Sequence, residues 1–171
     1  ALIGSLINVS ISDWTKVEAF GGMVIRDGFA EWLKILILSG LCASLLLSVT
    51  WVQENALLKF EYPLLVLFSG VGMLLMVSAN NLLSLYVSLE LSSFCLYILA
   101  AINRDNLLST EAGLKYFILG ALSSGLLLFG ISLVYGYTGS LSYTEIGLFL
   151  DRAASMPYGV MVGMVFVLAG L

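Results

Sequence analysis

Histidine is absent from the sequence, cysteine occurs twice, and charged residues are scarce. Seven basic and eleven acidic residues make up 11% of the 171 positions, less than half of the ~25% that is typical of a soluble domain. This scarcity excludes an ordinary soluble enzyme. Without histidine, and with Cys42 and Cys95 far apart in apolar runs, no clustered ligand set exists for zinc, haem or an iron–sulfur centre. The sequence has no Walker loop and no run of Lys or Arg, so nucleotides and nucleic acid are not expected as partners.

Apolar residues dominate instead, at 60% of the chain with a mean hydropathy of +1.05. A transmembrane helix takes about 20 such residues, and polar clusters divide the sequence into runs of about that length. The sequence therefore predicts an all-α membrane protein, a polytopic bundle of transmembrane helices in a lipid bilayer. The expected segments are a helix tail and extramembrane loop at 1–31, transmembrane helices at 32–50, 63–79, 82–102 and 112–137 with loops between them, and the start of a further helix at 158–171.

The last apolar run, residues 158–171, is short for a membrane span. A helix of this length rises only about 21 Å, against ~30 Å of hydrocarbon. A helix that stopped inside the bilayer would leave backbone carbonyls without hydrogen-bond partners. We therefore expect the chain to be a piece of something longer, with this run as a truncated fifth span.

Glu90 lies near the middle of the third predicted span, about 12 Å from its start. An acidic side chain at this depth costs about 2.5–3.5 kcal/mol on insertion scales. Tyr86, Glu90, Ser93 and Tyr97 recur at helical spacing and form one polar stripe. A carboxyl group in a low dielectric holds its proton more readily and can exchange it near neutral pH. Glu90 is therefore the leading candidate for proton transfer, and the alternative is a structural hydrogen bond made by a protonated side chain.

Three further charged residues near predicted helix starts are candidates for proton transfer. Lys115 follows Glu111 by four residues, with the acid on the N-terminal side that favours an ion pair. We expect Ser109 or Thr110 to cap this helix. The alternative for Lys115 is that its ammonium extends to the membrane interface. Glu61 stands just before the second span and has the same two interpretations.

Small residues are spaced four apart in the fourth span. Gly120 pairs with Ser124, and Ala121 pairs with Gly125. Such spacing allows two membrane helices to approach closely. The pattern predicts a packed bundle rather than a single anchor, and it carries no chemistry of its own.

The segment from Ser88 to Gly139 resembles a known family. SLELSSFCLYILAAINRD and STEAGLKYFILGALSSGLLLFGISLVYGYTG look like the antiporter-like membrane subunit called subunit 2 in mitochondrial complex I and subunit N in bacterial NADH–quinone oxidoreductase. The string AFGGMVIRDGFAEWLK, residues 19–34, is similar to the segment before the third transmembrane helix of that family. The resemblance covers essentially the whole chain.

The resemblance implies an antiporter-like fold with inverted repeats, of which this chain is part. Glu90 matches the family's essential glutamate, which forms a buried ion pair whose loosening and tightening drives proton uptake and release. Glu111 and Lys115 match the glutamate and lysine of the following helix, and Glu61 matches an acidic position at the start of the preceding one. The family's lysine of the broken seventh helix would follow Leu171. Its absence here makes us expect a split gene or an incomplete sequence.

The function implied by the resemblance is that of a proton-translocating membrane-arm subunit of complex I, NADH:ubiquinone oxidoreductase. Such a subunit couples quinone reduction elsewhere in the complex to proton pumping. No cofactor is expected on this chain, because flavin and iron–sulfur clusters would belong to partner subunits. The expected partners are the other membrane-arm subunits and a complementary chain carrying the remaining helices.

Two alternatives remain open at the level of sequence. The chain could belong to a multisubunit cation/proton antiporter, or it could be a split scaffold subunit without transport. A split gene would favour the mitochondrial inner membrane as its location, with a bacterial plasma membrane as the alternative.

Overall fold

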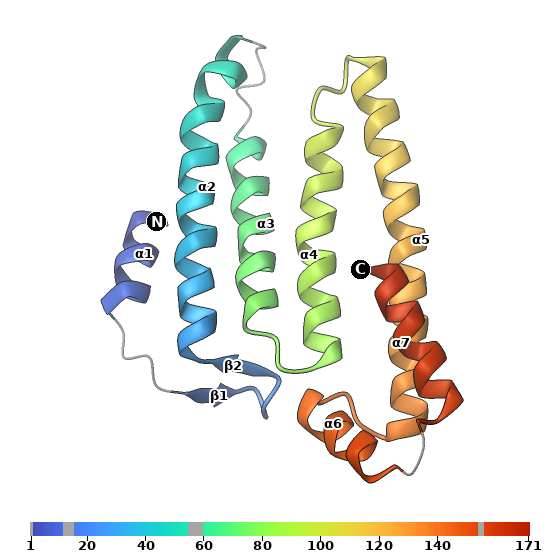
Figure 1. The fold of residues 1–171 in the computed structure, drawn as a ribbon. Coiled ribbons are helices and arrows are strands. Elements are labelled where there is room, and N and C mark those ends of the chain that lie inside the picture. The colour runs from blue at the N-terminus through green and yellow to red at the C-terminus, as the bar shows by residue number, and fades with distance from the viewer. Residues whose placement is uncertain (1, 12–15, 55–59, 154–155) are drawn as a thin grey trace.

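The computed structural model describes residues 2–11, 16–54, 60–153 and 156–171 of the chain. The elements are α1 (Leu2–Ile11), β1 (Val17–Ala19), β2 (Val24–Arg26), α2 (Gly28–Glu54), α3 (Glu61–Val77), α4 (Leu82–Ala100), α5 (Leu107–Thr138), α6 (Tyr143–Arg152) and α7 (Tyr158–Gly170). Helices α2 to α5 stand in a row and run alternately in opposite directions, with α7 beside the second half of α5 (Figure 1). The strands lie near the lower ends of α2 and α3 in this view, and α6 lies near the lower ends of α4 and α5, so all three are on the same side of the bundle.

The predicted helical membrane architecture is confirmed, and the helices differ from the predicted spans in their lengths. Among the described helices, three are long and apolar enough to cross a membrane: residues Gly28–Thr50 of α2, α4 and α5. Helix α3, predicted at 63–79, has 17 residues and rises only about 25 Å. It ends at Val77 because the residues after it leave the helix to form β-type hydrogen bonds with other segments.

Capping residues set the starts of α2 and α5, and both starts precede the predicted ones at 32 and 112. Asp27 caps α2 by accepting a hydrogen bond from the backbone N–H of Ala30 at 2.7 Å. Asn106 caps α5 by accepting one from the N–H of Leu108 at 2.9 Å. The prediction that Ser109 or Thr110 caps this helix is therefore wrong.

Two segments predicted as loops, residues 12–31 and 140–157, contain regular secondary structure. In the segment predicted as a loop at 12–31, β1 and β2 form an antiparallel hairpin whose outermost pair is Val17 and Arg26. The polar stretch between Ser140 and Pro157 contains the amphipathic helix α6. Other parts of the predicted loops, residues 12–15 and 55–59, lie outside the described residues.

β-type backbone hydrogen bonds connect the hairpin, the α3–α4 turn and the segment before α6. The N–H of Ile25 donates to the carbonyl of Ser78 at 2.8 Å, and Val24 and Ala79 form a bridge. On the other side, the N–H of Leu82 donates to the carbonyl of Leu141 at 3.0 Å. The turn between α3 and α4 is thus bonded both to the hairpin and to the segment that precedes α6.

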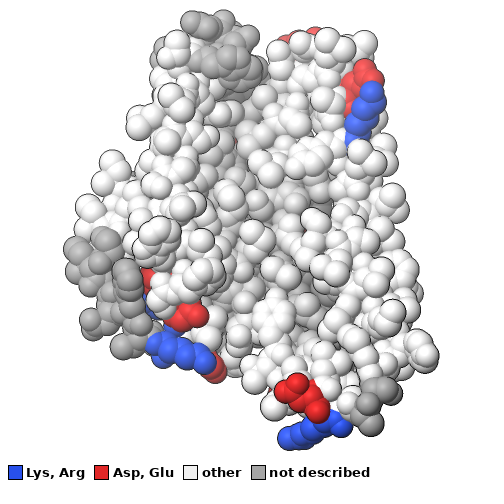
Figure 2. All heavy atoms as spheres, viewed as in Figure 1, with Lys and Arg blue, Asp and Glu red and all other residues white. Residues whose placement is uncertain are grey.

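Charge is distributed as a membrane protein requires. On the face shown in Figure 2, charged side chains gather toward the two ends of the bundle, with a broad uncharged region between them. This arrangement keeps ionised groups near the water-facing ends and leaves the middle to lipid or to neighbouring apolar helices.

Glycines lie at several helix contacts, and of the two predicted small-residue pairs the one that begins at Gly120 faces a neighbouring helix. Gly120 packs against the ring of Tyr97 in α4, whereas a Cβ added at Gly125 would meet nothing within 4 Å. Among the glycines of α5, Gly130 makes the tightest backbone approach: an added Cβ would lie 2.6 Å from the carbonyl oxygen of Gly163 and 2.6 Å from the N of Val167. The α5–α7 contact therefore depends on Gly130.

The Gly130→Ala substitution is expected to destabilise the protein by about 1–3 kcal/mol, because the new methyl group meets backbone atoms that cannot rotate away. Gly125→Ala is the matched control in the same helix, and it should be neutral or stabilising by up to about 1 kcal/mol. Thermal unfolding of the detergent-solubilised variants, followed by tryptophan fluorescence, measures the difference. Equal midpoints for the two variants would contradict this account of α5–α7 packing.

Candidate functional site

Glu90 is half-buried near the middle of α4, eight residues after Leu82, which corresponds to about 12 Å along the helix. Its side chain lines a cavity of about 360 Å³ between α4, α5 and the end of α7, which we call the Glu90 cavity. The polar residues that line this cavity are Glu90, Ser93, Tyr97, Tyr116, Ser123 and Ser124.

The predicted polar stripe of α4 faces α5. Glu90, Ser93 and Tyr97 all line the Glu90 cavity. The hydroxyl groups of Tyr86 and Ser124 lie 3.1 Å apart and form a hydrogen bond between the two helices. The four residues of the stripe therefore share one face of α4. Tyr86 bonds to α5, and the other three line the cavity.

Within the described part of the chain, the carboxyl group of Glu90 has no hydrogen bond or ion pair. The ion pair that the family resemblance implies for Glu90 is thus not formed among these residues, and it stays a prediction. The cavity beside the carboxyl group has room for several water molecules. The carboxyl group therefore borders a space that water can enter and that hydroxyl groups surround.

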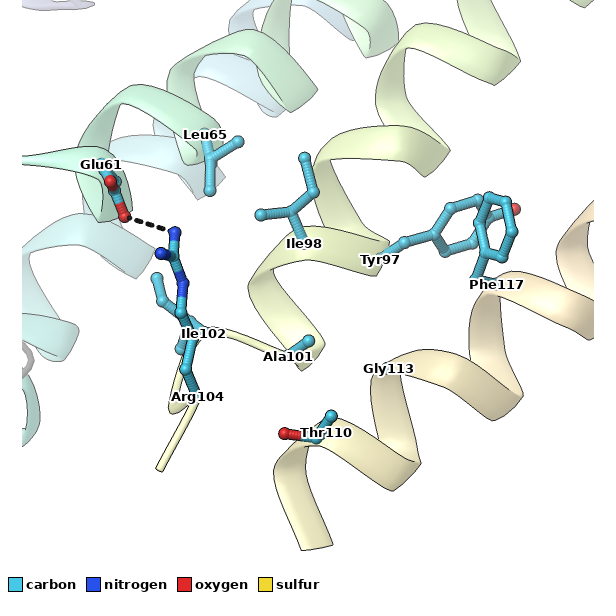
Figure 3. Close-up of a pocket in the computed structure, with 10 residues that line it drawn as sticks. All are labelled: Glu61, Leu65, Tyr97, Ile98, Ala101, Ile102, Arg104, Thr110, Gly113 and Phe117. Atoms are coloured by element: carbon cyan, nitrogen blue, oxygen red, sulfur yellow. Dashed lines mark hydrogen bonds and ion pairs between the residues drawn. The ribbon is translucent and has the colours of Figure 1, made fainter. Parts of the chain in front are cut away.

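A second cavity, which we call the Glu61 cavity, lies between α3, the end of α4 and the start of α5 and has a volume of about 430 Å³. Figure 3 shows the ion pair at one side of it, where Arg104 Nη2 lies 3.4 Å from Glu61 Oε2. These side chains are 71% and 47% exposed, so the pair contributes about 1 kcal/mol at most. The structure thus places Glu61 in a solvent-accessible ion pair at a helix start.

The predicted ion pair between Lys115 and Glu111 is present, with Lys115 Nζ 2.5 Å from Glu111 Oε1. Both side chains are exposed, and neither lines the Glu90 cavity or the Glu61 cavity. Because α5 begins at Leu107, Lys115 lies about two turns into the helix and not one as predicted. The structure therefore brings Lys115 together with Glu111 but not with Glu90.

Lys115→Ala is expected to reduce proton transport less than Lys115→Glu. The alanine variant removes one charge from an exposed pair, whereas the glutamate variant places two acids four residues apart and reverses the local charge. The initial rate of proton uptake in membrane vesicles containing the full-length protein is the measurement. A larger loss with alanine would show that the amine itself is required.

Sequence reasoning missed a buried acidic residue near the hairpin. Glu31 is 2% exposed, and its Oε1 accepts from Arg26 Nε at 3.0 Å and from Lys34 Nζ at 2.9 Å. The sequence contained one usable signal, since Lys34 follows Glu31 at i,i+3 in a helix. The second ion-pair partner of Glu31, Arg26, lies in β2. This contact was not predicted, because residues 12–31 were assigned to an extramembrane loop.

Comparisons with known proteins agree with this geometry. Residues 79–171 match the family model described as NADH:quinone oxidoreductase/Mrp antiporter, transmembrane. The chain is 48% identical over 171 residues to NADH-quinone oxidoreductase subunit N of Parvibaculum lavamentivorans, and this match covers all of the chain and 35% of the relative.

Two solved structures share the fold. A chain of respiratory complex I from Thermus thermophilus superposes with a TM-score of 0.76 at 32% identity, covering 99% of this chain and 35% of that one. A chain of the membrane-bound sulfane sulfur reductase, an archaeal respiratory membrane complex, gives a TM-score of 0.74 at 21% identity, with the same coverage of 99% and 35%.

The curated relative and the two solved structures match essentially the whole chain, but the chain covers only 35% of each of them. The chain spans about a third of the length of the curated relatives. The segment that the family model matches includes α6 and also α4, α5 and α7, whose residues line the Glu90 cavity. From its sequence and its fold, the chain belongs to the NADH:quinone oxidoreductase/Mrp antiporter family of membrane proteins.

Proposed function

We propose that the chain is part of a proton-translocating, antiporter-like subunit in the membrane arm of an NADH:quinone oxidoreductase. In this role it moves protons across the membrane while quinone is reduced elsewhere in the complex. The similarity to subunit N from Parvibaculum lavamentivorans supports the membership of such a complex. The other membrane-arm subunits are its proposed partners.

The observation that carries the proposal is the environment of Glu90. Its carboxyl group lies in the middle of an apolar helix that can span a membrane, and it borders a cavity lined with hydroxyl groups. Placing an acid at this depth is unfavourable, so a functional role is needed to explain it. A group that binds and releases protons must reach the next proton carrier directly or through water, and the cavity gives the carboxyl group that access.

We propose that redox chemistry takes place on partner subunits and that this chain supplies protonation sites. In the order in which we expect them to contribute, the candidates are Glu90, Lys115, Glu111 and Glu61. The exposed positions of the last three suit proton delivery between the bulk water and the interior better than storage of a proton in the membrane.

The location we propose is an energy-conserving membrane. The mitochondrial inner membrane stays a prediction from the sequence, and the bacterial origin of the relatives supports the bacterial plasma membrane. Fractionation of cells that express the tagged protein from its own gene tests this directly.

The family description also includes Mrp antiporters, so the test must separate the two kinds of assembly. The full-length protein, tagged and purified from native membranes in mild detergent, should carry flavin and iron–sulfur signals detectable by fluorescence and electron paramagnetic resonance. It should also oxidise NADH with a quinone acceptor. Purification without these groups, together with sodium-dependent proton exchange in vesicles, would replace the complex I proposal by the antiporter.

A further inference from the structure

Tyr97 lies where the two cavities meet. It lines the Glu61 cavity together with the Glu61–Arg104 pair, and it lines the Glu90 cavity together with Glu90 and Ser93. Among the residues that line these two cavities, Tyr97 is the one they share. In Figure 3 its ring stands beside Phe117, at the opposite side of the Glu61 cavity from the ion pair.

The ring of Tyr97 is held in place by other aromatic side chains. Its centroid lies 4.7 Å from that of Tyr116, 5.8 Å from that of Phe117 and 6.1 Å from that of Phe94, all in edge-to-face geometry. Such pairs contribute about 0.5–1.5 kcal/mol each beyond the area they bury. The orientation of the ring, and therefore of its hydroxyl group, is fixed from three sides.

The hydroxyl group itself points across to α5 at Gly120. A Cβ added to Gly120 would collide with the hydroxyl oxygen and with the ring carbon that carries it. Gly120 also lines the Glu90 cavity. The absence of a side chain at this position therefore lets the hydroxyl group of Tyr97 reach the wall of the Glu90 cavity.

The barrier between the cavities is thus an aromatic cluster, in which Tyr97 is the residue that lines both cavities. Tyr97 and Phe117 line the Glu61 cavity, and Tyr97 and Tyr116 line the Glu90 cavity. Aromatic rings interrupt a continuous chain of water molecules, because their faces offer no strong hydrogen-bond partner. A tyrosine hydroxyl group, by contrast, donates one hydrogen bond and accepts others at the same time.

We propose that the hydroxyl group of Tyr97 relays protons between the Glu61 cavity and Glu90, an inference that rests on the proposed function. The hydroxyl oxygen accepts a proton from a protonated water molecule on the Glu61 side. It releases its own proton to a water molecule or to the carboxylate on the Glu90 side. One proton is transferred and the tyrosine is neutral again once its own proton has left; rotation of the new O–H bond about the C–O bond then restores the starting orientation, and no oxidant or reductant is involved.

The test uses the full-length protein in the assembled complex, in sealed membrane vesicles. Tyr97→Phe keeps the ring and its aromatic contacts and removes only the hydroxyl group. A positioned proton carrier contributes ~10²–10⁴-fold to a transfer step and water can replace part of this, so we expect proton uptake to slow about tenfold. Gly120→Ala keeps the hydroxyl group but displaces it, and should also slow proton uptake.

The control is Tyr135→Phe, which removes a hydroxyl group from an exposed side chain of α5 that lines neither cavity. Its proton uptake should equal that of the wild type. NADH-dependent quinone reduction in uncoupled vesicles and the amount of assembled complex show whether any variant has simply failed to fold. For a variant that assembles poorly, the ratio of protons moved to NADH oxidised is compared instead.

Unchanged proton uptake in Tyr97→Phe, while Glu90→Gln is inactive in the same vesicles, would overturn the relay and leave the proposed function intact. Full activity of both variants would overturn the proposed function together with the relay. A loss in Gly120→Ala with no loss in Tyr97→Phe would also overturn the relay, because it would assign the effect to helix packing.

Discussion

The Glu90→Gln variant is expected to lose most or all coupled proton pumping while it still folds and assembles. Glutamine has nearly the same shape and is less costly to bury than an ionised carboxylate, so the packing of α4 should not suffer. The amide cannot take up and release a proton in the physiological range, and the described residues offer no acid that replaces it in the Glu90 cavity. We expect the initial rate of proton uptake to fall at least about tenfold.

The measurement compares proton uptake with NADH-dependent quinone reduction in sealed vesicles that contain the full-length protein. Glu145→Gln is a suitable control, because Glu145 lies in α6 outside the apolar spans and the amide can still accept the hydrogen bond from Ser140. Normal pumping in an assembled Glu90→Gln variant would show that Glu90 is not on the proton path. Loss of assembly with Glu90→Gln, but not with Glu145→Gln, would instead assign Glu90 a structural role.

The prominence of Glu90 could be predicted from the sequence because the signal is local. One acid in the middle of a long apolar run is visible in a window of 20 residues, and helical spacing places Ser93 and Tyr97 on its face. The structure confirms that these three side chains border one cavity. The cavity itself could not be predicted, because its other wall belongs to α5 and to the end of α7.

Helix ends were predicted less well than helix centres, since hydropathy does not detect caps. Asn106 lies in a polar cluster that is typical of a loop. Its side chain nevertheless caps α5, which begins at Leu107, five residues before the predicted start at 112. This error changed the assigned depth of Lys115. Asp27 started α2 early in the same way.

Contacts between distant segments account for the remaining differences. The close approach of Gly130 to Gly163 depends on how α7 returns along α5, which no single window of sequence shows. The hairpin is likewise stabilised from outside, because Ile25 donates to Ser78, a residue at the end of α3. Three-residue strands have little stability alone, so local propensity does not reveal them.

The Glu31→Gln variant is expected to destabilise the hairpin end of the bundle by about 2–3 kcal/mol. Removing one partner of a buried ion pair costs about 3–5 kcal/mol when the remaining charge is fully buried. Here the side chain of Glu31 is 3% exposed, but those of its partners Lys34 and Arg26 are 17% and 38% exposed. Water can therefore solvate part of the charge that is left, which lowers the expected cost below that of a fully buried pair.

Glu18→Gln is the matched control for this variant. It also removes one carboxylate from the hairpin region, where Glu18 Oε1 lies 3.7 Å from Lys16 Nζ, but both side chains are more than half exposed. Such a pair contributes about 0–1 kcal/mol, so its removal should hardly shift the unfolding midpoint. Thermal unfolding in detergent and the rate of proteolysis between residues 16 and 27 measure both variants.

The comparison also determines what Glu31 does for the bundle. Arg26 belongs to β2, and β2 is bonded to the turn between α3 and α4. Loss of the Glu31 charge should therefore loosen the hairpin from that turn, so that proteolysis of the hairpin accelerates before the whole protein unfolds. Equal proteolysis rates for Glu31→Gln and Glu18→Gln would show that backbone hydrogen bonds alone hold the hairpin in place, and that the ion pairs of Glu31 only compensate for its own burial.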